Sequence, residues 1–306
     1  MEDEYVISDG GRFVAVFDGH GGSGVSRYLR ESLYRRFLYF LGEVKDESQD
    51  VLPPSGSGNY SFRGSPVRSL SFLRRNATSP DSALSITHQM DALRSAFRAV
   101  EREVLSDDRF HYMGSTAVAV SFYGTGKEKS IVVANIGDSR AVLSSGKKAV
   151  NLTKDHKPND QTERSRIVAL GEKVEWDGYV HRVLDLSLSR AIGDRFAKPV
   201  VSSNVDIAQH RIREDDEFII LASDGLWDVM SSQEAVTFIH EKMSNFDDGL
   251  ASQLLNVDIQ NTDVVNTWKR KQMSRFLANE AMRRGTLDNV CVIVVWIKKE
   301  DQYADL

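Results

Sequence analysis

Short apolar runs rich in valine and isoleucine recur along the chain and predict buried β-strands. The runs are too short and too rich in β-branched residues to form convincing helices. Breaks that contain glycine separate several of them, which favours antiparallel hairpins over a regular alternation of strands and helices. The predicted strands cover residues 13–17, 116–122, 131–136, 218–222 and 290–297.

Between the predicted strands, apolar residues recur at helical spacing and predict amphipathic helices. Ser231 and Glu234 form a capping box at the start of one helix, and Gly285 stops the last. The predicted helices cover residues 22–41, 90–105, 235–243 and about 267–284. Strands with long helices at both ends and in the middle of the chain indicate an α+β layered domain.

Serine, proline and glycine dominate the segment from about residue 42 to residue 85, which has few periodic apolar residues. Such a segment buries too little apolar surface to offset the entropy cost of ordering it. Hydroxyls follow arginines in Arg68-Ser69-Leu70-Ser71 and in Arg74-Arg75-Asn76-Ala77-Thr78. They leave two interpretations open: a solvated linker, or a phosphorylated loop that serves regulation or docking. We expect a flexible insertion within a single domain that covers residues 1–306.

The composition is that of an ordinary globular protein, with 41% hydrophobic and 27% charged residues. The net charge of −5 argues against a nucleic-acid partner, because such proteins carry clustered basic surface. No apolar stretch approaches the roughly 18 residues of a membrane span, and the N-terminus lacks the basic and apolar parts of a signal peptide. We therefore expect a soluble, monomeric protein in the cytoplasm or the nucleus, without a nucleic-acid or membrane partner.

Four of the predicted strands carry an aspartate at one end. Asp18, Asp138 and Asp224 follow strands, and Asp288 precedes the last one. Asp228 lies four residues after Asp224, so one helical turn would bring both acids near one site. Taken singly, an aspartate such as Asp18 could equally cap the helix that follows it.

Four aspartates without matched lysines would repel one another, if gathered, unless cations neutralised them. Oxygen ligands favour Mg²⁺ or Mn²⁺ over zinc, and the single cysteine, Cys291, cannot build a thiolate site. Two such ions about 4 Å apart can generate a hydroxide and hold a phosphoryl oxygen. The pattern therefore predicts a hydrolase that attacks a phosphate ester. A calcium-binding EF-hand would need its ligands within one loop, whereas these are scattered along the chain.

Eight sequence blocks, in order and spanning nearly the whole chain, resemble the motifs of type 2C (PPM family) protein phosphatases. The resemblance implies a four-layer αββα sandwich, in which helices flank a central antiparallel β-sandwich with a metal site at one end. It also implies that a metal-activated water hydrolyses phosphoserine and phosphothreonine in protein substrates, among them kinases or their targets. The blocks are Met1-Glu2-Asp3, DGHGG (18–22), GSTAV (114–118), GDSRAVL (137–143), DHKP (155–158), SRAIGD (189–194), ASDGLWDVM (222–230) and LDNV (287–290).

The resemblance also implies the roles of individual residues at the metal site. Asp18 would bridge two Mg²⁺ or Mn²⁺ ions, the Gly19 carbonyl would bind one of them, and His20 would protonate the leaving oxygen. A histidine between glycines beside a metal ligand suits a general acid. The further ligands would be Asp224 and Asp288 on the first ion, Glu2 and Asp3 near the pair and partly through water, and Asp138 and Asp228 on a weaker third ion.

Residues 164–176 correspond to the flap that shapes substrate choice in this family. Arg164, Arg166 and Trp176 are its candidate substrate contacts, although each is also explained by a plain solvated helix and hairpin. Arg190 and Asp194 in the SRAIGD block are interpreted as a structural ion pair rather than as catalytic residues.

One feature departs from the family pattern. Family members carry an arginine shortly before the block that matches Met1-Glu2-Asp3, and this arginine binds substrate phosphate. That block is the N-terminus here, so we expect the arginine and the first strand to be missing. Losing such a contact weakens binding by about 1.5–3 kcal/mol. Either the sequence is truncated, or the protein is a pseudophosphatase or weakened enzyme that binds phosphoproteins or kinases without efficient turnover.

Overall fold

The computed structural model describes residues 1–42, 85–124, 129–245 and 262–297. The predicted insertion at about 42–85 lies almost wholly outside these residues, so its role stays a prediction. No helix among the described residues is long and apolar enough to cross a membrane.

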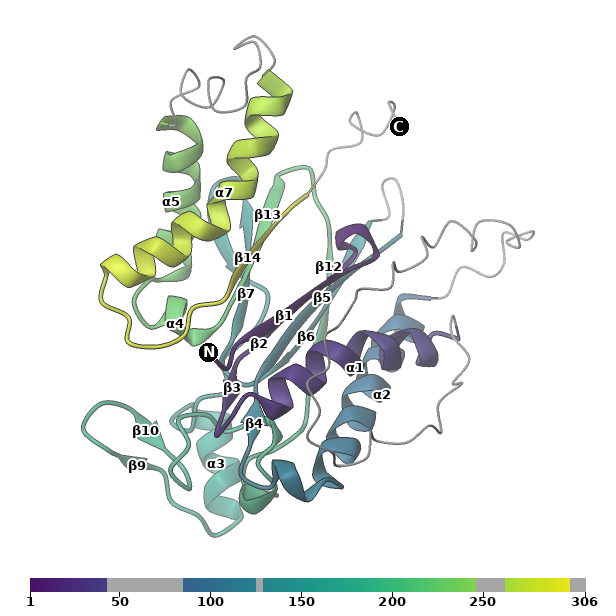
Figure 1. Ribbon diagram of the computed structural model, residues 1–306, viewed down its shortest axis with the longest axis vertical. Coiled ribbons are helices and arrows are strands. Elements are labelled where there is room, and N and C mark those ends of the chain that lie inside the picture. The colour runs from purple at the N-terminus through teal and green to yellow at the C-terminus, as the bar shows by residue number, and fades with distance from the viewer. Residues whose placement is uncertain (43–84, 125–128, 246–261, 298–306) are drawn as a thin grey trace, which may run out of the picture.

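Two antiparallel sheets form the centre of the molecule (Figure 1). The first has the order β1-β2-β5-β6-β12, and the second has the order β14-β13-β7-β8. The strands of the first sheet are β1 (Glu4–Ser8), β2 (Phe13–Phe17), β5 (Ala117–Tyr123), β6 (Ser130–Ile136) and β12 (Asp206–Arg211); those of the second are β7 (Arg140–Ser145), β8 (Lys148–Asn151), β13 (Asp216–Ala222) and β14 (Val292–Trp296).

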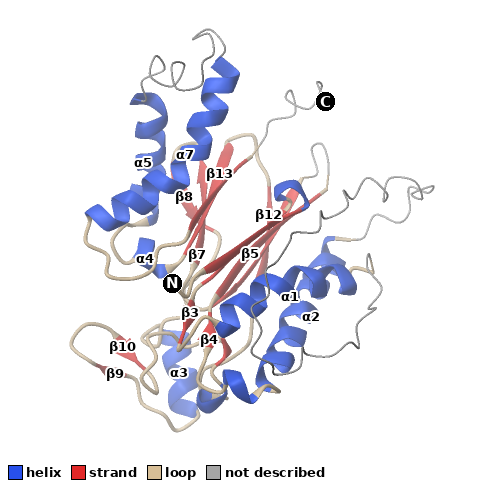
Figure 2. Cartoon of the chain, in the orientation of Figure 1, coloured by secondary structure: helices blue, strands red, loops and turns tan. Residues whose placement is uncertain are grey.

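Helices cover the outer face of each sheet (Figure 2). Helices α1 (Gly24–Phe40) and α2 (Ile86–Leu105) pack on the first sheet, while α5 (Ser232–Asn245) and α7 (Thr262–Arg283) pack on the second. A separate apolar cluster fills the space between the two sheets. The four layers confirm the predicted αββα sandwich.

Strand β2 shows why the strands read as continuous apolar runs. Phe13, Ala15 and Phe17 point to the helical layer, whereas Val14 and Val16 point to the other sheet. Both faces of the strand are therefore buried, so apolar residues do not alternate with polar ones along its sequence. Period-2 patterning is lost for the same reason in β6, which is buried along its whole length.

The predicted capping box is present at the start of α5. The Ser231 hydroxyl accepts a hydrogen bond from the Glu234 amide at 3.3 Å, and the Ser231 amide donates to the Glu234 carboxylate at 2.9 Å. Helix α7 ends at Arg283, and Gly285 follows with a positive φ of 87°, which glycine adopts without strain. The helix begins at Thr262, some residues earlier than predicted.

Short elements gather at one end of the sandwich. Three two-residue strands form a small sheet in the order β11-β4-β3, and a separate hairpin joins β9 to β10. These elements are β3 (Gly19–His20), β4 (Gly114–Ser115), α3 (Gln161–Ala169), β9 (Glu175–Trp176), β10 (His181–Arg182), β11 (Ile192–Gly193) and α4 (Asp224–Trp227), with 3₁₀ turns at Asp9–Gly11, Asp108–Phe110 and Arg195–Ala197.

Candidate metal centre

Strand direction brings the acidic residues of the first sheet to one edge. Strands β2 and β6 each pair antiparallel with β5, so both run the same way and end at the same edge. Asp18 and Asp138 follow these two ends. Glu4 pairs with Phe17, so the start of β1 delivers Glu2 and Asp3 to that edge as well.

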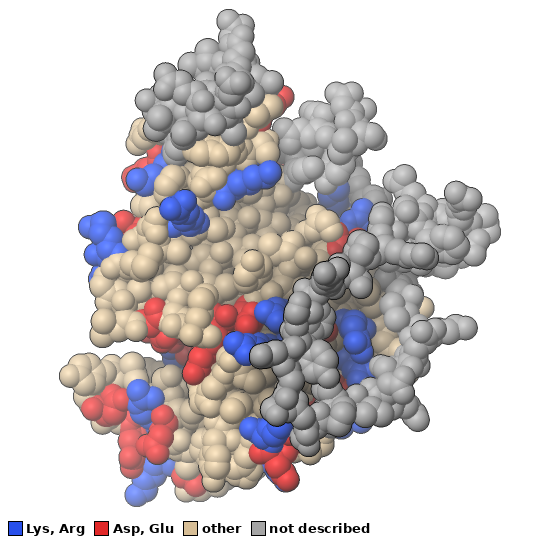
Figure 3. Space-filling view, in the orientation of Figure 1, with Lys and Arg blue, Asp and Glu red and all other residues tan. Residues whose placement is uncertain are grey.

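The second sheet adds its acids by the same rule. Ala222 at the end of β13 pairs with Val292 at the start of β14, which places Asp224 and Asp288 at neighbouring ends. The two edges face a shared cavity of about 460 Å³. Figure 3 shows acidic side chains gathered where the surface is hollowed above the β9–β10 hairpin. The predicted site residues that line the cavity are Glu2, Asp18, Gly19, His20, Asp138, Asp224 and Asp288.

Two predicted ligands lie beside the cavity rather than on its wall. Asp3 is 5% exposed, and its carboxylate accepts a hydrogen bond from the Ser223 hydroxyl at 2.8 Å. Asp228 is exposed one helical turn after Asp224, and its amide donates to the Asp224 carbonyl at 2.8 Å.

The backbone around Asp18 is fixed on both sides. The Asp18 amide donates to the Thr116 hydroxyl at 3.2 Å, and the Thr116 amide donates to the Asp18 carbonyl at 2.9 Å. A Cβ on Gly19 would lie 2.7 Å from both the Glu2 carbonyl and the Ser26 hydroxyl. Only glycine therefore lets the N-terminal segment approach the turn closely enough to bring Glu2 to the site.

The acids of the cluster are costly to ionise together. Burial and the charges of Asp224 and Asp3 raise the pKa of Asp18 to about 10. Burial, with Asp138 as the next contributor, raises the pKa of Asp224 to about 7. Burial also raises the pKa of Asp3. A divalent cation would remove this penalty, because it favours the ionised form of every carboxylate near it.

Unpaired buried oxygens also fit a cation. Asp3 Oδ1 and Asp224 Oδ1 are buried, and neither has a hydrogen-bond partner among the residues that the structure describes. A buried carboxylate oxygen without a partner is expensive unless it binds a cation. Within the described ranges, no three Asp, Glu, His or Cys side chains already converge on one point as ligands.

Lys157 corrects the expectation that the aspartates have no matched lysine. Its ammonium lies 2.5 Å from Asp138 and 3.7 Å from Asp224. Burial opposes its charge, but these two carboxylates raise the pKa of Lys157. Lys157 belongs to the DHKP block. It is distant in sequence from Asp138 and Asp224, so the sequence alone does not predict that it contacts both.

A second correction concerns Arg190 and Asp194, which do not pair with each other. Arg190 binds Glu163 at 2.5 Å and Asp206 at 2.9 Å. Asp194 is fully buried, and both of its carboxylate oxygens lie 2.8 Å from Nε2 of His20. The contact joins the SRAIGD block to the DGHGG block, so neither motif alone predicts it.

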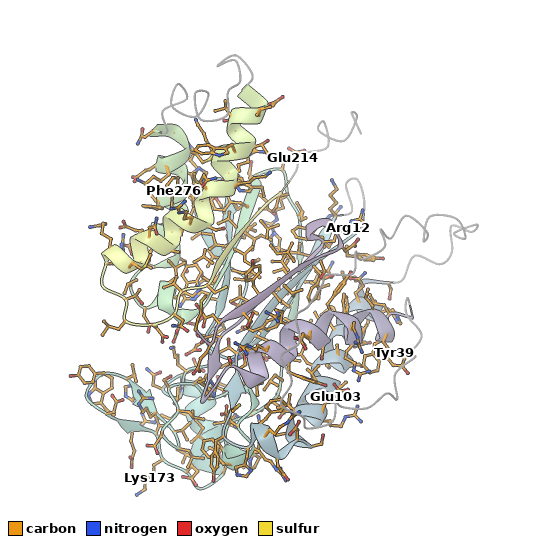
Figure 4. All side chains as sticks on the ribbon, viewed as in Figure 1. Arg12, Tyr39, Glu103, Lys173, Glu214 and Phe276 are labelled. Carbon is orange, nitrogen blue, oxygen red and sulfur yellow. The ribbon has the colours of Figure 1, made fainter. Side chains whose placement is uncertain are left out.

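The three flap candidates lie away from the cavity. Arg166 donates to the Val200 and Ser189 carbonyls and pairs with Glu163, so its guanidinium ties α3 to the neighbouring loop. Arg164 is exposed on α3, and Trp176 packs on His181 in the hairpin. Lys173, between α3 and β9, lies at the outer edge of the molecule (Figure 4). This side of the cavity is lined instead by Arg182, Asp185, Leu186, Ser187 and Leu188.

A family model described as protein phosphatase 2C matches residues 64–290. The chain belongs to the protein phosphatase 2C family. This finding confirms the family resemblance, and the matched region includes Asp138, Asp224 and Asp288 of the cavity. Metal dependence is general in the family, although the number and kind of ions on this chain remain proposals.

Curated relatives agree with this assignment. The chain is 31% identical to Protein phosphatase 2C 53 of Oryza sativa subsp. japonica over 293 residues, which cover 95% of this chain and 60% of that protein. It is 34% identical to Protein phosphatase 2C 50 of the same species over 287 residues, or 92% of this chain and 68% of that protein. The chain thus spans less than two thirds of the first relative.

Solved structures share the fold. A C. elegans sex-determining protein has a TM-score of 0.71 at 22% identity, covering 98% of this chain and 62% of its own. A serine-threonine phosphatase 2C from Toxoplasma gondii has a TM-score of 0.64 at 20% identity, covering 97% and 90%. At these identities the likeness supports the αββα architecture alone.

Proposed function

We propose that the chain is a metal-dependent protein phosphatase that hydrolyses phosphoserine and phosphothreonine. The observation that carries the proposal is the group of acids at one end of the sandwich, with Asp18 and Asp224 hard to ionise and His20 beside them in the same cavity. Such a group suits divalent cations and a phosphate ester, which needs both a nucleophile and charge neutralisation.

The acids would hold two Mg²⁺ or Mn²⁺ ions and a weaker third. When bound, these ions activate water and neutralise charge on the phosphoryl group. The chain's own part is to hold the ligands still: Thr116 fixes Asp18, and Ser223 orients Asp3. The proposed ligands are Asp18, the Gly19 carbonyl, Asp224, Asp288, Glu2 and Asp3, with Asp138 and Asp228 for the third ion.

His20 supplies the proton that the leaving alkoxide needs. An ionised Asp194 can only accept hydrogen bonds, so Nε2 of His20 is the donor in their contact. The contact holds the imidazole at the cavity wall. In the doubly protonated ring, Nδ1 carries the second proton; this proton passes to the serine or threonine oxygen and leaves His20 neutral. General acid catalysis of this kind contributes about 10²–10⁴-fold.

One observation favours a second candidate, a phosphoprotein-binding pseudophosphatase. Among the described residues that line the cavity, Arg182 is the one lysine or arginine, and it is already paired with Asp177. Arg182 would therefore bind substrate phosphate more weakly than an unpaired arginine would.

Turnover under saturating Mn²⁺ separates the two candidates. We expect EDTA-sensitive release of phosphate from phosphoserine and phosphothreonine peptides, and loss of that release in Asp224→Asn. Asp215→Asn, at an exposed acid outside the cavity, is the matched control and should retain activity. Activity that persists unchanged in EDTA would refute the metal-dependent mechanism. Tight phosphopeptide binding without turnover would establish the pseudophosphatase.

A further inference from the structure

The lining of the cavity combines the acids already described with two large aromatic side chains. Tyr112 and Phe196 form this aromatic rim; they are 70% and 41% exposed, with ring centroids 5.5 Å apart. Exposed aromatic residues that are adjacent to each other and to a polar cavity mark a contact surface more often than chance exposure does.

The two rings are anchored to the backbone that also places His20. A Cβ on Gly21, next to His20, would lie 2.2 Å from the Tyr112 carbonyl, so the two segments are in direct contact. The Asp194 amide donates to the Met113 carbonyl at 2.9 Å, which ties the Tyr112 segment to the partner of His20. Phe196 lies in the 3₁₀ turn that begins just after Asp194. The backbone that carries the aromatic pair is therefore fixed relative to the proposed general acid.

A second stretch of the lining, residues 182–188, exposes mainly charged groups. Asp185 is exposed and Arg182 is half-buried and paired with Asp177, whereas Leu186 is half-buried and Leu188 is buried. An apolar side chain of a bound peptide would leave these charged groups poorly solvated, whereas it would gain contact area on Tyr112 and Phe196. The aromatic rim and this second stretch thus differ in the side chains that they accept.

We propose that Tyr112 and Phe196 form a subsite for an apolar side chain that flanks the phosphorylated residue of the substrate. The inference rests on the proposed function, because it requires the phosphoresidue to sit between the acids and His20. The peptide then leaves the cavity across the rim, and an aliphatic or aromatic side chain next to the phosphoresidue packs on the aromatic pair. Contacts of this size in an apolar pocket discriminate by about 10–200-fold.

Phosphopeptides that differ at one flanking position test the subsite. A phosphothreonine peptide with alanine at all flanks is compared with versions that carry leucine or aspartate at each of the two positions on either side. We expect kcat/KM for leucine to exceed that for aspartate by about 10-fold or more at one of these positions. In Tyr112→Ser and in Phe196→Ser, the leucine-to-aspartate ratio should fall towards one, mainly through KM.

Tyr179→Ser is the matched control, because Tyr179 is 88% exposed on the nearby hairpin but does not line the cavity. It should leave the ratio unchanged. Fluorescence anisotropy with the same peptides reads the preference even without turnover, so failure of the phosphatase function and failure of the subsite give different results. A wild-type ratio near one, or a ratio that both serine variants leave intact, overturns the proposal.

Discussion

Both carboxylate oxygens of Asp194 lie 2.8 Å from Nε2 of His20, although the two residues are 174 positions apart. Asp194 adopts a left-handed backbone conformation with φ 48° and ψ 50°, one that aspartate tolerates better than most residues. Asp194 is fully buried, and its carboxylate faces His20 rather than solvent. The contact makes Asp194 a positioning residue for the proposed general acid.

Replacing His20 or Asp194 should slow the reaction most for substrates whose leaving group needs a proton. His20→Gln is expected to lower kcat on phosphothreonine peptides by about 10²–10⁴-fold. The loss on p-nitrophenyl phosphate should be much smaller, because p-nitrophenolate leaves without a proton. Asp194→Asn should show a weaker loss with the same dependence on leaving group. Steady-state kinetics on both substrates measure it, and equal losses on both would contradict the positioning role.

Lys157 neutralises Asp138 and Asp224 from within the protein. Lys157→Met should therefore lower the unfolding free energy of the metal-free protein by about 1.5–3 kcal/mol, since it removes a charged hydrogen bond to Asp138 and a longer ion pair with Asp224. A divalent ion can replace the missing charge, so Mg²⁺ or Mn²⁺ should stabilise this variant more than the wild type.

Thermal unfolding with and without the ions measures this difference. The control is Lys154→Met, which removes a more exposed lysine, paired with Asp160. A metal-induced rise in Tm that is the same in Lys157→Met and the wild type would contradict the idea that lysine and metal serve the same acids.

Metal stabilisation should grow with pH. The pKa values of Asp18, about 10, and Asp224, about 7, are far above the ordinary 3.8, so the folded metal-free protein holds protons that the unfolded chain has lost. Its unfolding free energy therefore falls as pH rises from about 4 through 7, and on towards 10 for Asp18. A bound cation removes this fall in the unfolding free energy, because it stabilises the ionised carboxylates. Differential scanning fluorimetry should show a larger Mg²⁺-induced rise in Tm at about pH 8 than at about pH 5.5, and the reverse order would refute it.

Glu163 anchors α3 to the loop that carries Arg190. Burial opposes its ionisation, but hydrogen bonds from Arg190 and Arg166 lower the pKa of Glu163 to about 2. Glu163→Gln should cost about 3–5 kcal/mol in urea unfolding at about pH 7. The difference from the wild type should shrink as pH falls from about 4.5 towards 2, where the wild-type carboxylate becomes protonated. Glu175→Gln, at an exposed hairpin residue, is the control and should change little.

Much of this protein was predictable from the sequence because local rules decide it. Continuous apolar runs identified strands β2, β6 and β13, since both faces of a sandwich strand are buried. The Ser231–Glu234 capping box and Gly285 marked helix ends through contacts that span only a few residues. An aspartate at a strand end could also be read as a candidate ligand, because the strand itself fixes where it lies.

Tertiary structure decided the contacts between residues far apart in the chain. The partners of Arg190 and Asp194 differ from the predicted ones, because Glu163, Asp206 and His20 reach them from other elements. The same holds for Lys157 and for the rim formed by Tyr112 and Phe196, whose meeting depends on the packing of separate loops. Local sequence fixes the elements and the ends at which their acids stand; which charge neutralises which acid is fixed only when the two sheets pack.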